Sequence, residues 1–172
     1  VVTDFSGTAF DVNSANSNRI EGCHAENYIG GSIHPAFQNK HSSTDNSKLN
    51  IFANNTAKNV HTGWYSQDGS RCMVNGFTVE GCNIGIRANN APHNQFANIY
   101  VKDYSETGVW IHSSSGEYII DNLKLETTTA TAKGILIQAS AGGLIDNVTM
   151  GATLIAAGIE IDSTSHNTRI GT

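Results

Sequence analysis

Four carboxylates in the second half of the chain have a spacing that could support acid–base chemistry. Asp121 and Asp146 each stand directly before an asparagine, in successive copies of one short pattern. Asp103 and Glu106 lie close together in a polar turn. Two carboxylates that lie close together repel, so one of them holds its proton more tightly. An acid–base pair needs such a difference in pKa, and we therefore take all four as candidate catalytic acids.

A structural interpretation stays open for Asp121 and Asp146. An aspartate that precedes an asparagine at a corner of the chain can simply accept hydrogen bonds from backbone amides. The choice between the two interpretations depends on whether the fold makes these two carboxylates direct neighbours.

A second set of side chains has the types that bind a sugar. Arg87, Tyr100, Trp110 and His112 lie in one short stretch of the chain. Aromatic rings pack on the apolar face of a sugar ring, and charged groups contact its hydroxyls or carboxylates. We take these four as candidate substrate-binding residues. The alternative is that Trp110 and Leu136 form an apolar contact between protomers, or lie under an insertion.

The elements that position these residues follow from a pattern that returns after roughly 22 to 26 residues, a period typical of repeat architectures. Three short apolar patches recur in each repeat, and the second of them always follows a glycine. The first patch includes Phe77, Ile99, Leu123 and Val148, and the second includes Ile86, Val109, Ile135 and Ile159. Three short strands per repeat are typical of a parallel β-solenoid. The sequence therefore predicts an all-β fold, with three strands in each rung.

A solenoid converts sequence columns into rows of neighbouring side chains, because successive rungs lie about 4.8 Å apart. Asp121 and Asp146 then lie one rung apart, near the roughly 5 Å separation of carboxylates in retaining glycosidases. Arg87 and Trp110 fall in one outward row, His112 in the next, and Tyr100 on a neighbouring strand.

Two further columns predict the corners of the coil. A glycine at the head of the second strand implies either a positive φ or a close backbone approach. Asn98, Asn122 and Asn147 fall in one column, and asparagine tolerates left-handed backbone. A stacked asparagine ladder at one corner is therefore expected.

Composition excludes several classes of function. Charged residues make up 15% of the 172 residues and the net charge is −5 without a basic run, which argues against nucleic acid as a partner. No apolar stretch is long enough for a membrane helix. The three cysteines lack CxxC spacing, the histidines lack HExxH spacing, and Gly30-Gly31 lacks the lysine of a phosphate cradle. We predict no metal and no cofactor.

We expect residues 1–172 to form a single domain. The regular pattern runs from about residue 75 to 170, whereas 34–71 breaks the rhythm and is interpreted as a loop excursion or a few irregular rungs. Neither end resembles the cap that a terminal repeat needs, so we expect the chain to be part of a larger protein.

In 122–137 and 147–161, Asn-hydrophobic-x-hydrophobic is followed by a turn and Gly-Ile-x-Ile. This pattern resembles the right-handed parallel β-helix of the pectate-lyase-like superfamily. That superfamily includes pectate lyases, polygalacturonases, alginate epimerases and lyases, and bacteriophage tailspikes. The resemblance implies contact with an acidic or surface polysaccharide, often with cleavage. The catalytic motifs of polygalacturonases and pectate lyases are missing from this sequence. The chain therefore most resembles a tailspike or depolymerase segment, a class that forms homotrimers.

From this resemblance we expect a segment that binds cell-surface polysaccharide and degrades it as a glycosidase or lyase, located in a virion tail or secreted. The competing hypothesis is a non-catalytic structural or adhesive β-helix shaft that binds host glycan. A secreted adhesin of the autotransporter type is a third option, and it rests on fold analogy alone.

Overall fold

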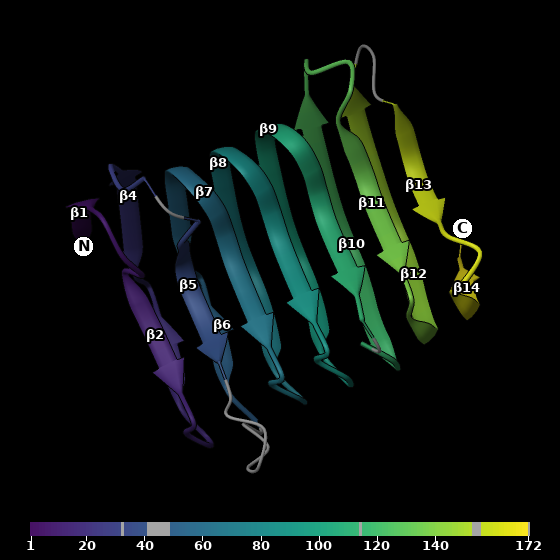
Figure 1. The fold of residues 1–172 in the computed structure, drawn as a ribbon, viewed down its shortest axis with the longest axis horizontal. Helices are drawn as coiled ribbons and strands as arrows, with labels where there is room; N and C mark the ends of the chain where they lie inside the picture. The colour runs from purple at the N-terminus through teal and green to yellow at the C-terminus, as the bar shows by residue number, and fades with distance from the viewer. Residues whose placement is uncertain (32, 41–48, 114, 153–155, 172) are drawn as a thin grey trace.

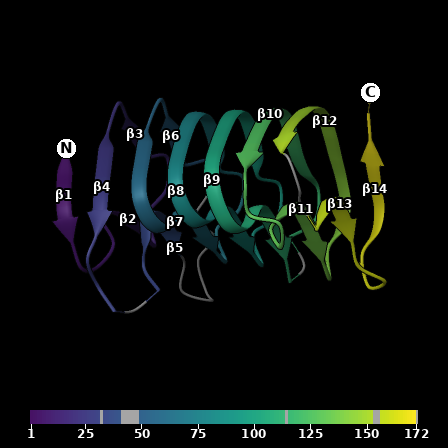
Figure 2. The same cartoon turned by 90° about the horizontal axis from the view of Figure 1, so that it is seen from above.

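The computed structural model is a coil of parallel β-strands without a helix among the residues that it describes, which are 1–31, 33–40, 49–113, 115–152 and 156–171. Fourteen strands form one sheet that winds through about six turns. Figure 1 shows the strands running side by side from the N-terminus to the C-terminus. Figure 2 shows the successive coils along the axis. The predicted all-β parallel solenoid is confirmed.

Most strands are short, but several run through one or two corners of the coil without interruption. The strands are β1 (Val2–Phe5), β2 (Phe10–Asn13), β3 (Arg19–Glu21), β4 (His24–Tyr28), β5 (Pro35–Lys40), β6 (Ile51–Ala53), β7 (Thr56–Gln67), β8 (Met73–Asn89), β9 (Gln95–His112), β10 (Tyr118–Thr127), β11 (Lys133–Gln138), β12 (Ala141–Ala152), β13 (Ala157–Ile161) and β14 (His166–Ile170).

The pairing divides the coil into three sides. Side one consists of β3, β6, β14 and the first parts of β8, β9, β10 and β12. Side two consists of β1, β4, the first part of β7, the middle of β8 and β9, and the last parts of β10 and β12. Side three consists of β2, β5, β11, β13 and the last parts of β7, β8 and β9. Side three faces the viewer in Figure 1.

The register confirms the columns expected from the repeat. Phe77 pairs with Ile99, which in turn pairs with Leu123. These side chains point into the core, where each is at most 2% exposed. Burial of every second side chain inside the coil supplies most of the stability of such a fold. The remaining side chains form the outward rows that could contact a ligand.

The stretch 34–71, for which the sequence left a loop excursion or irregular rungs open, contributes β5, β6 and β7 to the stack. The rungs are longer here than in the second half of the chain, as the pairing of Glu26 with Lys58 and of Gln38 with Tyr65 shows. Residues 41–48 belong to this stretch and lie outside the described residues. The variable spacing explains why the repeat is hard to see before residue 73.

The glycines that begin the side-three parts of β7, β8 and β9, and the glycine near the start of β11, are explained by close backbone approach. A Cβ built on Gly85 would lie 2.5 Å from the carbonyl oxygen of Gly108, one rung away. The same contact recurs between Gly63 and Gly85, and between Gly108 and Gly134. At these glycines a larger side chain would collide with the next rung, so of the two causes expected, close approach is the one that holds. Ala36 of β5 occupies the same column opposite Gly63.

The expected asparagine ladder lies at the corner between sides one and two. Asn98, Asn122 and Asn147 all have left-handed backbone, with φ of 53°, 50° and 49°. Asn122 Nδ2 donates to Asn98 Oδ1 at 2.5 Å, and Asn98 Nδ2 donates to Asn75 Oδ1 at 2.7 Å. Side-chain amides thus connect successive rungs at a turn that asparagine tolerates.

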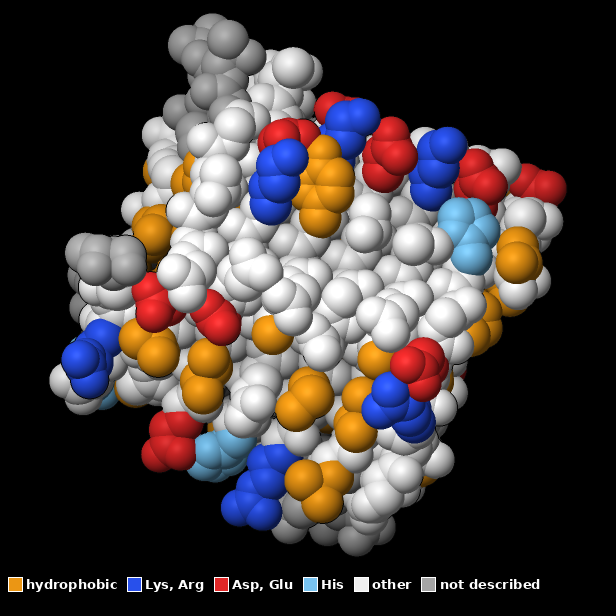
Figure 3. Space-filling view, turned by 180° about the vertical axis from the view of Figure 1, so that it is seen from behind, with side chains coloured by type: hydrophobic (Ala, Val, Ile, Leu, Met, Phe, Trp, Pro, Cys, Tyr) orange, Lys and Arg blue, Asp and Glu red, His pale blue; other side chains and the backbone are white. Residues whose placement is uncertain are grey.

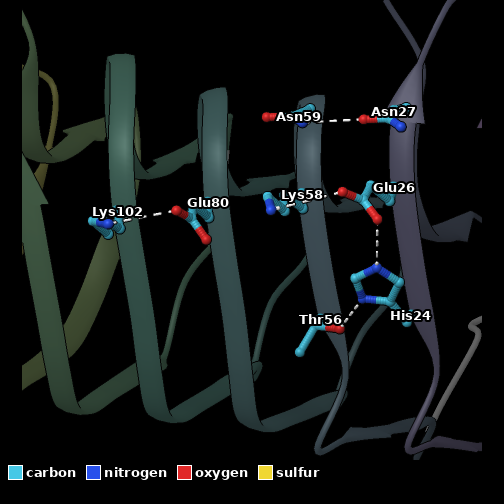
Figure 4. A network of polar contacts seen from close by, with 8 residues as sticks. All are labelled: His24, Glu26, Asn27, Thr56, Lys58, Asn59, Glu80 and Lys102. Atoms are coloured by element: carbon cyan, nitrogen blue, oxygen red, sulfur yellow. Dashed lines mark hydrogen bonds and ion pairs between the residues drawn. The ribbon is translucent and has the colours of Figure 1, made fainter.

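A row of alternating charge runs along the outside of side two. Register places Glu26, Lys58, Glu80, Lys102 and Glu126 in one row across five rungs. Lys58 Nζ lies 3.7 Å from Glu26, and Lys102 Nζ lies 3.4 Å from Glu80. Figure 3 shows positive and negative side chains alternating along one edge of the molecule. Figure 4 shows the two ion pairs from close by.

We expect Lys102→Gln to reduce the free energy of unfolding by at most about 1 kcal/mol, because exposed ion pairs are screened by water. The deficit should shrink as salt is raised from 0.05 M to 1 M, since salt weakens the lost attractions. Urea unfolding of the parent and of Lys102→Gln at the two salt concentrations measures this difference in the free energy of unfolding. A loss of several kcal/mol that is insensitive to salt would contradict this account of the row.

Candidate functional site

Three of the four candidate substrate-binding residues meet on side three. Register places Arg87 beside Trp110, one rung away, and His112 follows two residues later on β9. The Arg87 guanidinium carbon lies 4.5 Å from the centroid of the Trp110 ring. Arg87 Nε donates to His112 Nε2 at 3.1 Å, and the Trp110 and His112 rings stack at 4.6 Å between centroids. Each of these side chains fixes the orientation of the other two.

Two more residues complete this side-three cluster, which we define as Tyr65, Arg87, Trp110, His112 and Gln138. Tyr65 pairs with Arg87 from the rung before, and its ring centroid lies 5.3 Å from the guanidinium carbon. Gln138 Oε1 accepts a hydrogen bond from the indole nitrogen of Trp110 at 2.9 Å. Sequence reasoning missed Tyr65 because the stretch 34–71 was interpreted as irregular. The signal was present, since Gly63 and Tyr65 precede Gly85 and Arg87 by 22 residues.

The cluster holds His112 as a neutral acceptor. Burial lowers the pKa of His112 to about 4, and the positive charge of Arg87 acts in the same direction. A neutral imidazole can accept the proton of Arg87 Nε, whereas an imidazolium cannot. The hydrogen bond between Arg87 and His112 is therefore complete at neutral pH and is lost near pH 4.

The lowered pKa of His112 predicts that the folded chain becomes less stable as the pH falls below 6.5. The pKa of His112 is about 4 in the folded chain and 6.5 for an ordinary histidine, so the unfolded chain takes up the proton first as pH falls. The stabilisation is present above pH 6.5 and is lost between about pH 6.5 and 4. We expect His112→Gln, which can still accept from Arg87, to lose less stability than the parent over that window.

Urea unfolding at pH 7 and pH 4.5 measures the difference. Burial lowers the pKa of His61 as well, so a smaller dependence on pH remains in the variant. Identical pH profiles for the parent and His112→Gln would contradict the assignment.

The fourth candidate, Tyr100, lies on side two and not in the cluster. Its hydroxyl donates to the carboxylate of Glu126, and its ring centroid lies 4.8 Å from Lys124 Nζ. The hydrogen bond to Glu126 raises the pKa of Tyr100. Tyr100 therefore belongs to the charged surface of side two, and the structure does not bring it to Arg87 and Trp110.

Asp103 and Glu106 lie at the corner between sides two and three, and both are exposed. Asp103 Oδ2 is 3.6 Å from Lys102 Nζ. Glu106 Oε1 accepts a hydrogen bond from Asn83 Nδ2 at 3.1 Å. Burial is the main cause that lowers the pKa of His61, but Glu106 and Arg87 both act on it electrostatically. Glu106 therefore lies within electrostatic reach of the same imidazole as Arg87.

Asp121 and Asp146 are direct neighbours in register on side one, as their sequence column predicts. Asp121 Oδ1 accepts from Asn147 Nδ2 at 2.8 Å, and Asp146 Oδ1 accepts from the backbone amide of Asn147 at 2.9 Å. The Asp146 contact is the turn contact that we gave as the alternative to catalysis, whereas Asp121 accepts from a side chain one rung away. Asp146 also lines a hollow of about 520 Å³, together with interior residues such as Ile145 and Ile159. Neither aspartate lies on the side that carries the cluster.

The described residues contain no group of three or more His, Cys, Asp or Glu side chains that could hold a metal ion. Burial raises the pKa of the Cys72 and Cys82 thiols to about 12. Both therefore stay protonated, which makes them poor ligands and poor nucleophiles. In the part of the chain that the structure covers, no helix is long and apolar enough to cross a membrane.

The arrangement on side three suits a flat ligand surface better than an enclosed reaction chamber. A cation held between two aromatic rings offers donors, while the ring edges offer apolar contact area. Such a combination is suited to binding a sugar chain that lies across the rungs. Glu106 lies at the corner next to side three, and Glu160 lies on side three in the row of Trp110 and Leu136, whereas Asp121 and Asp146 lie on side one.

No protein-family model and no curated protein matches the chain. Solved structures do match it. A DFA-IIIase from Arthrobacter chlorophenolicus A6, crystallised without its lid, has a TM-score of 0.64 and 10% sequence identity, over 96% of this chain and 50% of that one. The catalytic domain of a GH87 alpha-1,3-glucanase in complex with nigerose has a TM-score of 0.57 and 17% identity, over 94% and 45%.

A further structure, a GH87 alpha-1,3-glucanase catalytic domain in complex with tetrasaccharides, has a TM-score of 0.54 and 14% identity, over 93% of this chain and 46% of that one. The chain spans about half the length of the proteins that it matches. At these identities the likeness establishes the fold, which is that of a parallel β-solenoid shared with two glucanase structures and a DFA-IIIase.

Proposed function

We propose that this chain is the solenoid segment of a protein that engages polysaccharide, and that the side-three cluster is its glycan-contact surface. The observation that carries the proposal is the assembly of Tyr65, Arg87 and Trp110 into one outward row with His112 beside it. The neighbours support it, because two of them are glucanase domains in complex with saccharides.

The side chains of the cluster are already ordered before a ligand binds. Binding a sugar chain costs the conformational entropy of the side chains that become fixed. Here Arg87 and Trp110 are already fixed by their contacts with each other and with His112, Tyr65 and Gln138, so little of that cost remains. A surface that is ordered before binding favours affinity. Its five side chains come from four successive rungs, so they can contact an extended ligand along its length.

Degradation of the glycan is the second part of the proposal. Glu106 is the first choice for a general acid, because it lies at the corner beside side three and is held by Asn83. Asp103, Asp121 and Asp146 are the other candidates, and each is engaged with a neighbouring Lys or Asn. The reaction would be that of a glycosidase or a lyase. Either reaction needs a general acid or a general base beside the bound sugar, and a carboxyl group can serve as one.

We further propose that the full protein is a tailspike-like homotrimer, located either in a virion tail or outside the cell after secretion. Its partner would be a cell-surface polysaccharide. The resemblance of its repeats to tailspikes supports this origin. The competing function is a non-catalytic shaft that binds host glycan, which the engagement of all four candidate carboxylates in local contacts favours.

A glycan array followed by an activity screen on the bound polysaccharides tests both functions. Release of reducing ends indicates hydrolysis, and ultraviolet absorbance from an unsaturated product indicates a lyase. We expect Glu106→Gln to lose turnover while binding remains, and Asp121→Asn to keep both. Glycan binding without any turnover supports the shaft. Full turnover in all four amide variants would contradict the proposed acids.

A further inference from the structure

A hollow of about 300 Å³ lies at the corner between sides two and three, away from the cluster's own side chains. Its walls come from the segment after β4, which includes Gly30, Gly31 and Ile33, and from β7 and β8, which supply His61 and Asn83. Small-molecule pockets typically measure roughly 300 to 1,000 Å³. This hollow is at the lower end of that range, which suits one small ring and not a chain.

The polar wall of the hollow is neutral. Asn59 Nδ2 donates to Asn27 Oδ1 at 3.0 Å, as Figure 4 shows, and Asn83 Nδ2 donates to Glu106 at 3.1 Å. Each amide is therefore held in one orientation but keeps further donor and acceptor capacity. His61 Nδ1 contacts Thr62 Oγ1 at 3.1 Å, and burial lowers its pKa, so the ring is uncharged at pH 7.

The other residues that line the hollow are apolar or aromatic. They include Tyr28, Val60 and Ile33, whose side chain is exposed. Gly30 lies directly against the hydroxyl of Tyr28, so an added Cβ there would collide with it. Gly31, by contrast, has no heavy atom of the described residues outside its chain neighbours within 4 Å of the position that its Cβ would take. The absence of a side chain at Gly31 therefore leaves space at the edge of the hollow.

We propose that this hollow is a binding site for a single neutral pyranose ring. A pyranose has an apolar C–H face and a rim of hydroxyls, each of which is both a donor and an acceptor. The hollow offers one aromatic wall, amide and imidazole groups that can also donate and accept, and no charged side chain among the described residues that line it. A phosphate or a carboxylate would find no cation among them.

The hollow shares no residue with the side-three cluster, although Asn83, which lines it, donates to the proposed acid Glu106. A terminal sugar unit or a side branch of a polysaccharide is the natural source of such a ring. The hollow would then recognise an end or a branch, whereas the cluster would contact the chain.

The test is titration of the isotope-labelled chain with methyl pyranosides of glucose, galactose, mannose and N-acetylglucosamine, followed by NMR. We expect at least one to shift the signals of Gly31, His61 and Asn83 with a millimolar dissociation constant. Gly31→Leu places a side chain in the hollow without a backbone clash and should weaken that binding at least tenfold. Gly7→Leu is the matched control, because Gly7 also has open space and does not line the hollow.

Asn83→Ser provides a second variant that leaves the space open and removes only the amide, and it should also weaken binding. Urea unfolding of each variant separates a lost site from a lost fold. The proposal is overturned if none of the four pyranosides shifts these signals, if glucuronate binds and the neutral sugars do not, or if folded Gly31→Leu binds as the parent does.

Discussion

Gly85→Ala is expected to lower the free energy of unfolding by more than about 2 kcal/mol, although it adds a single methyl group. The new Cβ would lie 2.5 Å from the carbonyl oxygen of Gly108 and 2.5 Å from Val101 Cγ1. That oxygen is backbone, so it can move only if rung-to-rung hydrogen bonds of side three lengthen. The methyl group also meets Val101 from side two of the coil, across the core, which leaves it no direction in which to relax. Urea unfolding followed by circular dichroism measures the loss.

Gly7→Ala is the matched control for this change. Apart from its chain neighbours, no heavy atom of the described residues lies within 4 Å of the Cβ position of Gly7, so we expect a change within about 0.5 kcal/mol. The comparison cancels the effect of removing a flexible glycine from the unfolded chain, which is similar at both sites. If Gly85→Ala were as stable as Gly7→Ala, successive rungs would not approach as closely as the structure shows.

Trp110→Ala is expected to weaken binding of the cognate polysaccharide fragment by about 30-fold or more, corresponding to a truncation cost of about 2 kcal/mol at a central aromatic contact. The loss has two parts: the apolar ring edge disappears, and Arg87 loses the ring that holds its guanidinium. Arg87→Ala should weaken binding to a similar extent. Isothermal titration calorimetry with an oligosaccharide from the glycan screen gives both affinities.

The variant that combines Arg87→Ala with Trp110→Ala tests whether the two side chains bind the ligand together or independently. Because Arg87 and Trp110 touch, we expect the combined loss to be smaller than the sum of the two single losses. Met73→Ala is the control, because Met73 is an exposed hydrophobic side chain on side one, 40% exposed. A full loss of binding in Met73→Ala, with Trp110→Ala unaffected, would place the glycan on another side of the coil.

Much of the fold follows from the sequence because a solenoid repeats its own pattern. The spacing of Phe77, Ile99 and Leu123 gives the register directly, and the structure pairs them as expected. The register is hard to see before residue 73 because the rungs there are unequal in length, as the pairing of Glu26 with Lys58 and of Gln38 with Tyr65 shows. Tyr65 itself pairs with Arg87 at the ordinary spacing, so Gly63 could have placed it.

The site is harder to predict, because a column defines the rung neighbours of a residue but not the side of the coil on which it lies. The side depends on the corners, which are set by left-handed residues such as Asn98 and Asp103. Arg87 and Trp110 are adjacent in a column and meet, whereas Tyr100 precedes the Asp103 corner and so lies on side two. Asp121 lies on side one for the same reason.

Fluorescence offers a direct view of the proposed surface, since the chain has two tryptophans that differ in environment. Trp64 is 0% exposed between Phe52 and Phe96 in the core, and Trp110 lies on the outside of side three. The deciding measurement is the change in tryptophan emission when the cognate oligosaccharide is added to the parent and to Trp110→Phe, in which Trp64 alone emits. We predict a saturable change in the parent that vanishes in the variant. The same change in both proteins, or binding without any change in the parent, would show that the sugar does not contact this row.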